Sequence, residues 1–253
     1  MGLFKNIKLI RNRYALNEDK KKIINRKVKK MRKLICIGFG NIPRYINGKL
    51  MPYETKEIDE EIINITNKKK PKMLFISLAS YHPKEYFDGI YKIYSKLGCI
   101  VQHFDINKSY DELEKDIMSS DIIYVGAGDT KYLLQQLHNN KIDKLLIKAY
   151  EKGIICVGMS AGTYIWFKYT YNLIKGMNVI DAVCCAHYNE KDDAKKKQFH
   201  DVIKEYNLTG YAIENCVALE FIDDEIKIIK SNPKYNAYKI SYSDNKFITE
   251  LIK

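Results

Sequence analysis

The stretch Ile-Ile-Cys-Val-Gly-Met-Ser-Ala-Gly-Thr (IICVGMSAGT) occupies residues 154–163. Its apolar first part predicts a buried strand, and residues 158–162 match the pattern G-x-S-x-G. In that pattern a strand turns sharply into a helix, and small flanking residues leave room for the strained turn. The turn lifts the central side chain above the sheet, so Ser160 is a candidate nucleophile. The alternative is a glycine-flanked serine in a helix-capping turn.

Short apolar runs alternate with amphipathic helical stretches on both sides of this motif. Continuous apolar runs such as Met73–Ala79 are typical of strands that are covered on both faces. The alternation predicts an α/β fold, a mostly parallel sheet with helices on both faces. Strands are expected at 34–39, 73–79, 100–106, 122–125 and 154–157, with a helical run from Thr163 after the last of them. Residues 216–221, 225–229 and 237–243 predict a β-rich, antiparallel C-terminal extension of the same domain.

The positive charge of the chain is concentrated at its N-terminus. Of the net +12 of the 253 residues, residues 1–33 hold 13 Lys or Arg against Glu18 and Asp19. We therefore expect a basic N-terminal extension over 1–33 and a nearly neutral α/β domain over 34–253. The extension is either a solvated lysine-rich segment or an arm that contacts anionic lipid or nucleic acid. The body itself is not expected to bind nucleic acid.

Composition and cysteine usage exclude several classes of protein. Hydrophobic residues make up 46% of the chain, which is typical of a globular fold. There is no apolar run long enough for a membrane span and no secretory signal. The cysteines form no CxxC pair, so we expect free thiols in a reducing cytoplasm rather than disulfides or a zinc site. They occupy positions 36, 99, 156, 184, 185 and 216.

A glycine-rich loop is expected to meet Ser160 at one edge of the sheet, because loops at the carboxyl ends of neighbouring parallel strands line one crevice. The loop 126–129 (GAGD) ends the preceding strand, and the backbone N–H groups of Gly128 and Ala161 are candidate oxyanion donors. The loop lacks the motifs of dinucleotide or P-loop binding, which disfavours a nucleotide site. Among five histidines, His187 follows an apolar run and marks a strand end, where a base is needed.

Three motifs together resemble the dipeptidase E and cyanophycinase family of serine peptidases. They are residues 122–134 (IIYVGAGDTKYLL), 157–167 (VGMSAGTYIWF) and 186–189 (AHYN), and the resemblance covers roughly residues 34–230. It implies a class I glutamine-amidotransferase-like, flavodoxin-like fold without a cofactor. By the same resemblance Ser160 is the nucleophile, His187 the base, and Gly128 and Ala161 the oxyanion donors.

The third member of a catalytic triad is the open point. The family places an acid between serine and histidine, and Asp181 is the only acid in that interval, so Asp181 is expected to orient His187. Glu190 and Asp192 follow the histidine. A Ser–His dyad, or a histidine oriented by water or Asn, is the alternative.

The resemblance implies a cytoplasmic serine-type peptidase that hydrolyses a small peptide, with an N-terminal aspartate as one option. Lys131, Lys168 and Lys191 are the candidates for holding an acidic substrate group. Two other interpretations stay open. One is a catalytically degenerate member of the same fold that binds or regulates, and the other is a protein that binds anionic surfaces through its basic arm. A homodimer is one option for the oligomeric state.

Overall fold

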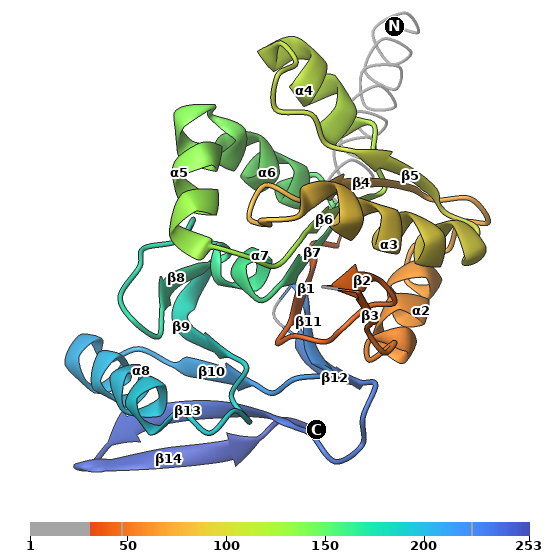
Figure 1. Cartoon of the computed structure of the whole chain (residues 1–253). Coiled ribbons are helices and arrows are strands. Elements are labelled where there is room, and N and C mark those ends of the chain that lie inside the picture. Colours follow the sequence, from red (N-terminus) through yellow and green to blue (C-terminus); the bar gives the residue numbers. More distant parts are fainter. Residues whose placement is uncertain (1–30, 47, 224) are drawn as a thin grey trace, which may run out of the picture. The chain divides into compact units, whose positions relative to one another are not determined.

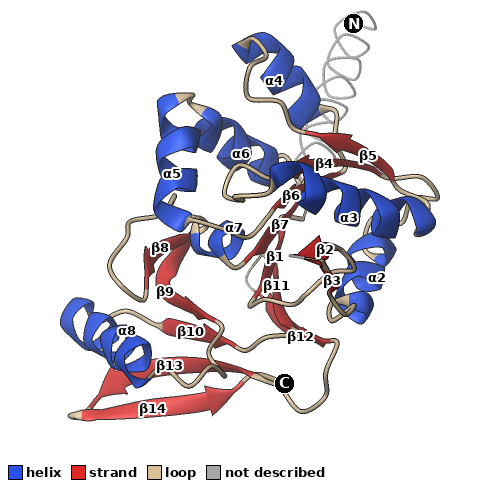
Figure 2. Cartoon of the chain, viewed as in Figure 1, coloured by secondary structure: helices blue, strands red, loops and turns tan. Residues whose placement is uncertain are grey.

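The computed structural model describes residues 31–46, 48–223 and 225–253, so most of the expected basic extension over 1–33 lies outside the described residues. Strands alternate with helices over residues 56–164, apart from two consecutive helices at 130–151, and strands follow one another from residue 210 onward (Figures 1 and 2). The helices are α2 (Lys56–Asn64), α3 (Pro83–Lys96), α4 (Tyr110–Met118), α5 (Thr130–Asn139), α6 (Ile142–Glu151), α7 (Ala161–Tyr164) and α8 (Asp193–Tyr206). None of the helices in the described ranges is long and apolar enough to cross a bilayer.

The central sheet contains seven strands of the described chain, in the order β12-β11-β1-β7-β6-β4-β5. The five strands from β1 to β5 in this order run parallel, as the sequence predicted, while β11 and β12 are added antiparallel at one edge. Their bounds are β12 (Glu225–Lys230), β11 (Val217–Ile222), β1 (Lys33–Ile37), β7 (Ile155–Met159), β6 (Ile122–Val125), β4 (Lys72–Ile76) and β5 (Ile100–His103).

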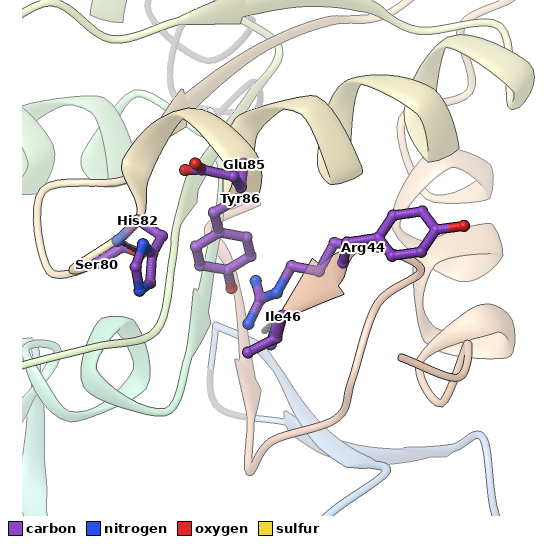
Figure 3. A pocket seen from close by; sticks show the side chains of 7 residues that line it. Arg44, Ile46, Ser80, His82, Glu85 and Tyr86 are labelled. Carbon is purple, nitrogen blue, oxygen red and sulfur yellow. Dashed lines mark hydrogen bonds between the residues drawn. The ribbon is translucent and has the colours of Figure 1, made fainter. Parts of the chain in front are cut away.

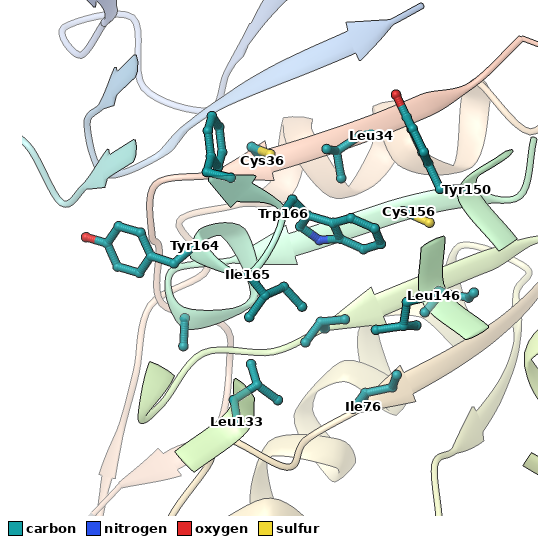
Figure 4. Packing of buried hydrophobic residues seen from close by; sticks show 14 of the residues in the cluster. Leu34, Cys36, Ile76, Leu133, Leu146, Tyr150, Cys156, Tyr164, Ile165 and Trp166 are labelled. Carbon is teal, nitrogen blue, oxygen red and sulfur yellow. The ribbon is translucent and has the colours of Figure 1, made fainter. Parts of the chain in front are cut away.

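Alternating side chains of the parallel strands enter two different hydrophobic clusters, which explains why helices cover both faces. Ile35 and Ile37 of β1 pack with the buried faces of α2 and α3. Leu34 and Cys36 of the same strand pack with α4, α5 and α6. Figure 4 shows this second cluster around the buried indole of Trp166.

A second sheet of the described chain has the order β14-β13-β10-β9-β8. Its strands are β14 (Lys246–Leu251), β13 (Ala237–Ser243), β10 (Gly210–Ile213), β9 (Ile180–Ala186) and β8 (Phe167–Thr170), and β2 (Tyr45–Ile46) and β3 (Lys49–Leu50) form a separate small ribbon. The β-rich C-terminal part is thus present but divided: β11 and β12 extend the central sheet, whereas β13 and β14 join β8, β9 and β10.

The helix expected from Thr163 is wrong beyond its first turn, because α7 ends at Tyr164 and the chain enters β8 at Phe167. The carbonyl of Ile165 accepts from Met177 N–H at 2.7 Å, and that of Trp166 accepts from Val179 N–H at 2.9 Å. These carbonyls therefore pair with a neighbouring segment instead of continuing the helix.

Candidate active site

Ser160 lies at a strained turn between β7 and α7. Its backbone has φ 51° and ψ −107°, outside the regions that a residue with a side chain usually adopts. The N–H of Ser160 donates to Ile37 O at 3.0 Å, and the hydroxyl of Thr163 donates to Ile37 O at 2.8 Å or to Gly158 O at 2.7 Å. The turn is thus tied to β1, its neighbour in the sheet, which offsets the strain.

The glycines on either side of Ser160 are required because another backbone carbonyl lies close to each of them. A Cβ on Gly158 would lie 2.1 Å from the carbonyl oxygen of Gly162, and one on Gly162 would lie 2.0 Å from that of Val125. Such separations are far inside van der Waals contact, so neither position accepts a side chain without a backbone shift. The G-x-S-x-G pattern therefore reflects the packing of the turn against β6.

His187 follows β9, a strand of the second sheet, and lines the same cavity as Ser160. The Ser160 Oγ and His187 Nε2 atoms are 2.8 Å apart. The imidazole stacks on the ring of Phe39 with 4.6 Å between centroids, and its backbone has φ 55°. These contacts fix the ring in position to accept the proton of the serine hydroxyl.

Glu190 is the acid that contacts His187. Its Oε1 atom lies 2.9 Å from His187 Nδ1. Because an ionised carboxylate can only accept, Nδ1 carries the proton and Nε2 is left as the acceptor for Ser160. Burial lowers the pKa of His187, an effect that Glu190 opposes and the positive charge of Lys195 reinforces. The imidazole is therefore neutral near pH 7, which is the state a base needs.

The prediction for Asp181 is corrected by its position. Asp181 lies at the start of β9, its carboxylate pairs with Lys168 Nζ at 2.7 Å, and its side chain is 69% exposed. His187 comes after the other end of this strand, and six extended residues span roughly 20 Å. Asp181 therefore cannot orient His187. The signal for the actual neighbour was the spacing of three residues from His187 to Glu190, within one turn after the strand.

The two predicted oxyanion donors have N–H groups without an acceptor among the described residues. Gly128 has φ +147°, and a Cβ there would lie 1.8 Å from Ala79 O, so this position requires glycine. Asp129 then caps α5 by accepting from Tyr132 N–H at 2.8 Å. The Gly128 backbone lines the same cavity as Ser160 and His187, and the Ala161 N–H directly follows the serine.

The cavity at Ser160 has a volume of about 220 Å³. Besides the residues already described, Tyr164, Tyr171 and Lys195 line it. The sequence did not single out Lys195, which lies in the first turn of α8. Of the lysines that it did single out, Lys168 is held by Asp181, and Lys131 and Lys191 are not part of the described lining.

No group of three or more His, Cys, Asp or Glu side chains in the described ranges is arranged to hold a metal ion. The polar groups gathered at Ser160 are instead a hydroxyl, an imidazole, a carboxylate, an ammonium group and free backbone N–H groups. This set is suited to acyl transfer by a serine nucleophile.

The chain is similar to known peptidases in both sequence and structure. The model of peptidase family S51 matches residues 47–229. The uncharacterized peptidase YgaJ of Bacillus subtilis (strain 168) is 26% identical over 225 residues, which cover 85% of this chain and 94% of the relative. The uncharacterized peptidase Lin0382 of Listeria innocua is 27% identical over 166 residues, 59% of this chain and 78% of the relative.

Two solved structures share the fold. A candidate peptidase E protein from Listeria monocytogenes EGD-e has a TM-score of 0.62 at 22% identity, covering 79% of this chain and 98% of that one. A peptidase from an acI-B1 Actinobacterium has a TM-score of 0.66 at 19% identity, covering 89% and 98%. With the family match spanning well over half of the sequence, the chain belongs to peptidase family S51 and is a hydrolase of the dipeptidase E type.

Proposed function

We propose that the protein hydrolyses short peptides with an acidic N-terminal residue through an acyl-enzyme on Ser160. The observation that carries the proposal is the continuous chain of hydrogen bonds from Ser160 Oγ through His187 to Glu190, at 2.8 and 2.9 Å. A serine alone is a weak nucleophile at neutral pH, and a neutral imidazole at this distance removes that limitation.

The reaction follows from the position of each group. His187 Nε2 takes the proton of Ser160 as Oγ attacks the peptide carbonyl, and the N–H groups of Gly128 and Ala161 stabilise the resulting oxyanion. The imidazolium, stabilised by Glu190, then protonates the leaving amine. Water enters, His187 removes its proton, and the acyl-enzyme is hydrolysed. Because Glu190 fixes the Nδ1–H tautomer, we assign it the role that the sequence had suggested for Asp181.

Lys195 supports the preference for an acidic residue. Its side chain lines the cavity at Ser160, and its Nζ lies 5.3 Å from the centroid of the Tyr171 ring. It forms no ion pair with any carboxylate in the described part of the chain. An ammonium group in a small cavity beside the nucleophile is suited to bind an aspartate side chain. The six cysteines, all free and buried, support a reducing cytoplasmic setting for this activity.

The test is hydrolysis of Asp-Leu, Asn-Leu and Ala-Leu by the full chain, together with labelling by a serine-reactive phosphonate. We expect cleavage of Asp-Leu in preference to Asn-Leu, with labelling that disappears in Ser160→Ala. Lys195→Gln should reduce the preference for Asp over Asn by about 10-fold or more, because it removes a charge-assisted hydrogen bond.

Folded wild-type protein that neither reacts with the phosphonate nor cleaves any of the three dipeptides would favour the catalytically degenerate interpretation instead. The interpretation as an anionic-surface binder depends on the basic extension over 1–33, of which residues 1–30 lie outside the described ranges. Comparing the salt-dependent retention of the full chain and of residues 34–253 on an anionic matrix tests that interpretation.

A further inference from the structure

A second cavity lies between the ribbon strand β2 and the first turn of α3. It has a volume of about 200 Å³. Figure 3 shows the side chains of Arg44 and Ile46 on one side and those of Ser80 and His82 on the other, with Tyr86 between them. The cavity takes no part in the mechanism proposed above.

Arg44 contributes to this cavity a buried guanidinium nitrogen that has no acceptor among the described residues. Its guanidinium carbon lies 4.2 Å from the centroid of the Tyr86 ring, and its Nη1 atom is fully buried without a hydrogen-bond partner among the described residues. The carboxylate of Glu85 lines the same cavity but points away from Arg44, and the two form no ion pair. A buried N–H left without an acceptor costs free energy that a bound anion would recover.

The second cavity lies directly beside the catalytic turn. The Tyr86 hydroxyl accepts a hydrogen bond from Ala127 N–H at 3.2 Å and contacts Met159 Sδ at 3.4 Å. Ala127 precedes the oxyanion donor Gly128, and Met159 precedes the nucleophile. Gly128 lines the cavity at Ser160, and its neighbour Ala127 is hydrogen-bonded to Tyr86, which lines the Arg44 cavity. The loop at 127–128 therefore connects the two cavities.

We infer that Arg44 binds the free C-terminal carboxylate of the peptide, so that its cavity is the subsite for the residue released by cleavage. This inference rests on the proposed function, in which Lys195 holds the acidic residue on the acyl side. A guanidinium matches a carboxylate through two parallel N–H groups, and Nη1 supplies one that is already desolvated. A peptide held by its two charged ends would be short, which makes Arg44 a determinant of substrate length.

The experiment compares Asp-Leu with Asp-Leu amide, which share the scissile bond and differ only in the terminal carboxylate. For the wild-type chain we expect kcat/KM to be about 10- to 100-fold higher for the free acid. Arg44→Met should reduce this acid-to-amide ratio to near 1, whereas Arg44→Lys should keep part of it. Lys49→Met, which removes an exposed positive charge from the same ribbon, is the matched control and should keep the full ratio.

A binding measurement separates this inference from the proposed function. In Ser160→Ala, calorimetric titration with the same two peptides requires no turnover, and the acid should bind more tightly only when Arg44 is present. If the acid binds more tightly through Arg44 but the wild type does not hydrolyse it, the proposed function is wrong and the inferred subsite is supported. Equal binding and cleavage of acid and amide would overturn the subsite alone. An Arg44→Met protein that stays folded in thermal unfolding and keeps the full ratio would also overturn it.

Discussion

His187 has its proton affinity set by opposing neighbours. Burial and the ammonium group of Lys195 lower its pKa below the usual 6.5, while the charge and hydrogen bond of Glu190 raise it. The net shift is downward, so activity that needs the neutral imidazole is lost only when the pH falls below this lowered pKa. A neutral imidazole over the whole neutral range is the state that the proposed role of His187 as a base requires.

Replacing Glu190 by Gln tests its positioning role. We expect kcat to fall by about 10²- to 10⁴-fold, because the neutral amide no longer selects the Nδ1–H tautomer or stabilises the imidazolium. The acidic limb of the pH profile of kcat/KM should also move to lower pH, because a group that raised the pKa of His187 has been removed. The pH profiles of wild type and Glu190→Gln between pH 4 and 9 measure both effects.

Asp181→Asn is the matched control, since it removes a carboxylate from the far end of β9. It should leave the pH profile and kcat within about twofold of wild type, as expected for an exposed ion pair. A large loss in Asp181→Asn together with an unchanged Glu190→Gln enzyme would reverse the assignment of the acid.

The sequence was sufficient to place Ser160 and His187 together but not to identify the acid beside them. Both residues follow strand ends, but a shared sheet edge explains only how Ser160 meets the loop at Gly128, because the strand before His187 belongs to the second sheet. Asp181 was predicted from the order of catalytic residues along the chain in related peptidases. That order does not give the distance in space between the acid and the histidine. Five residues of β9, 182–186, separate Asp181 from His187, whereas a short turn brings Glu190 back onto the ring.

Ser160, the proposed nucleophile, precedes a single helical turn, whereas the sequence predicted a helical run from Thr163. A helix of four residues adds little to the field at the oxyanion, because the helix dipole grows with aligned peptides. The proposal therefore relies on the local N–H groups of Gly128 and Ala161 to stabilise the oxyanion. Residues 164–167 form a short apolar run, and such a run does not distinguish a helix from a buried strand.

Gly162→Ala should destabilise this element. The added Cβ would lie 2.0 Å from Val125 O, which forces α7 away from β6. We expect a loss on the order of 3 kcal/mol in the free energy of unfolding, measured by urea titration. Lys131→Ala on the exposed face of α5 is the control and should change it by less than about 0.5 kcal/mol. Equal free energies of unfolding for the two variants would show that the turn between β7 and α7 can relax around a methyl group.

At the scale of the whole molecule, the sequence predicted the parallel sheet and its covering helices but not the division of the β-rich part into two sheets. The apolar periodicity of 216–221 and 237–243 marks both as strands, and periodicity contains no information on which edge a strand joins. The division depends on side chains distant in sequence, such as Cys184 and Ile213, which share a cluster with Leu34 and Cys36.

This division places the proposed nucleophile and base on different sheets: Ser160 follows a strand of the central sheet, and His187 follows a strand of the second. The 2.8 Å contact between them exists only while the sheets stay docked. We therefore expect the midpoint urea concentration for loss of hydrolysis to be lower than the midpoint for loss of the far-ultraviolet circular dichroism signal. The reason is that local separation of the sheets costs less free energy than global unfolding. Coincident midpoints would mean that the sheets separate and unfold as one unit.

The rate of hydrolysis would then report whether the two sheets are docked. A small molecule that binds between the sheets and separates them would inhibit hydrolysis without occupying either substrate cavity.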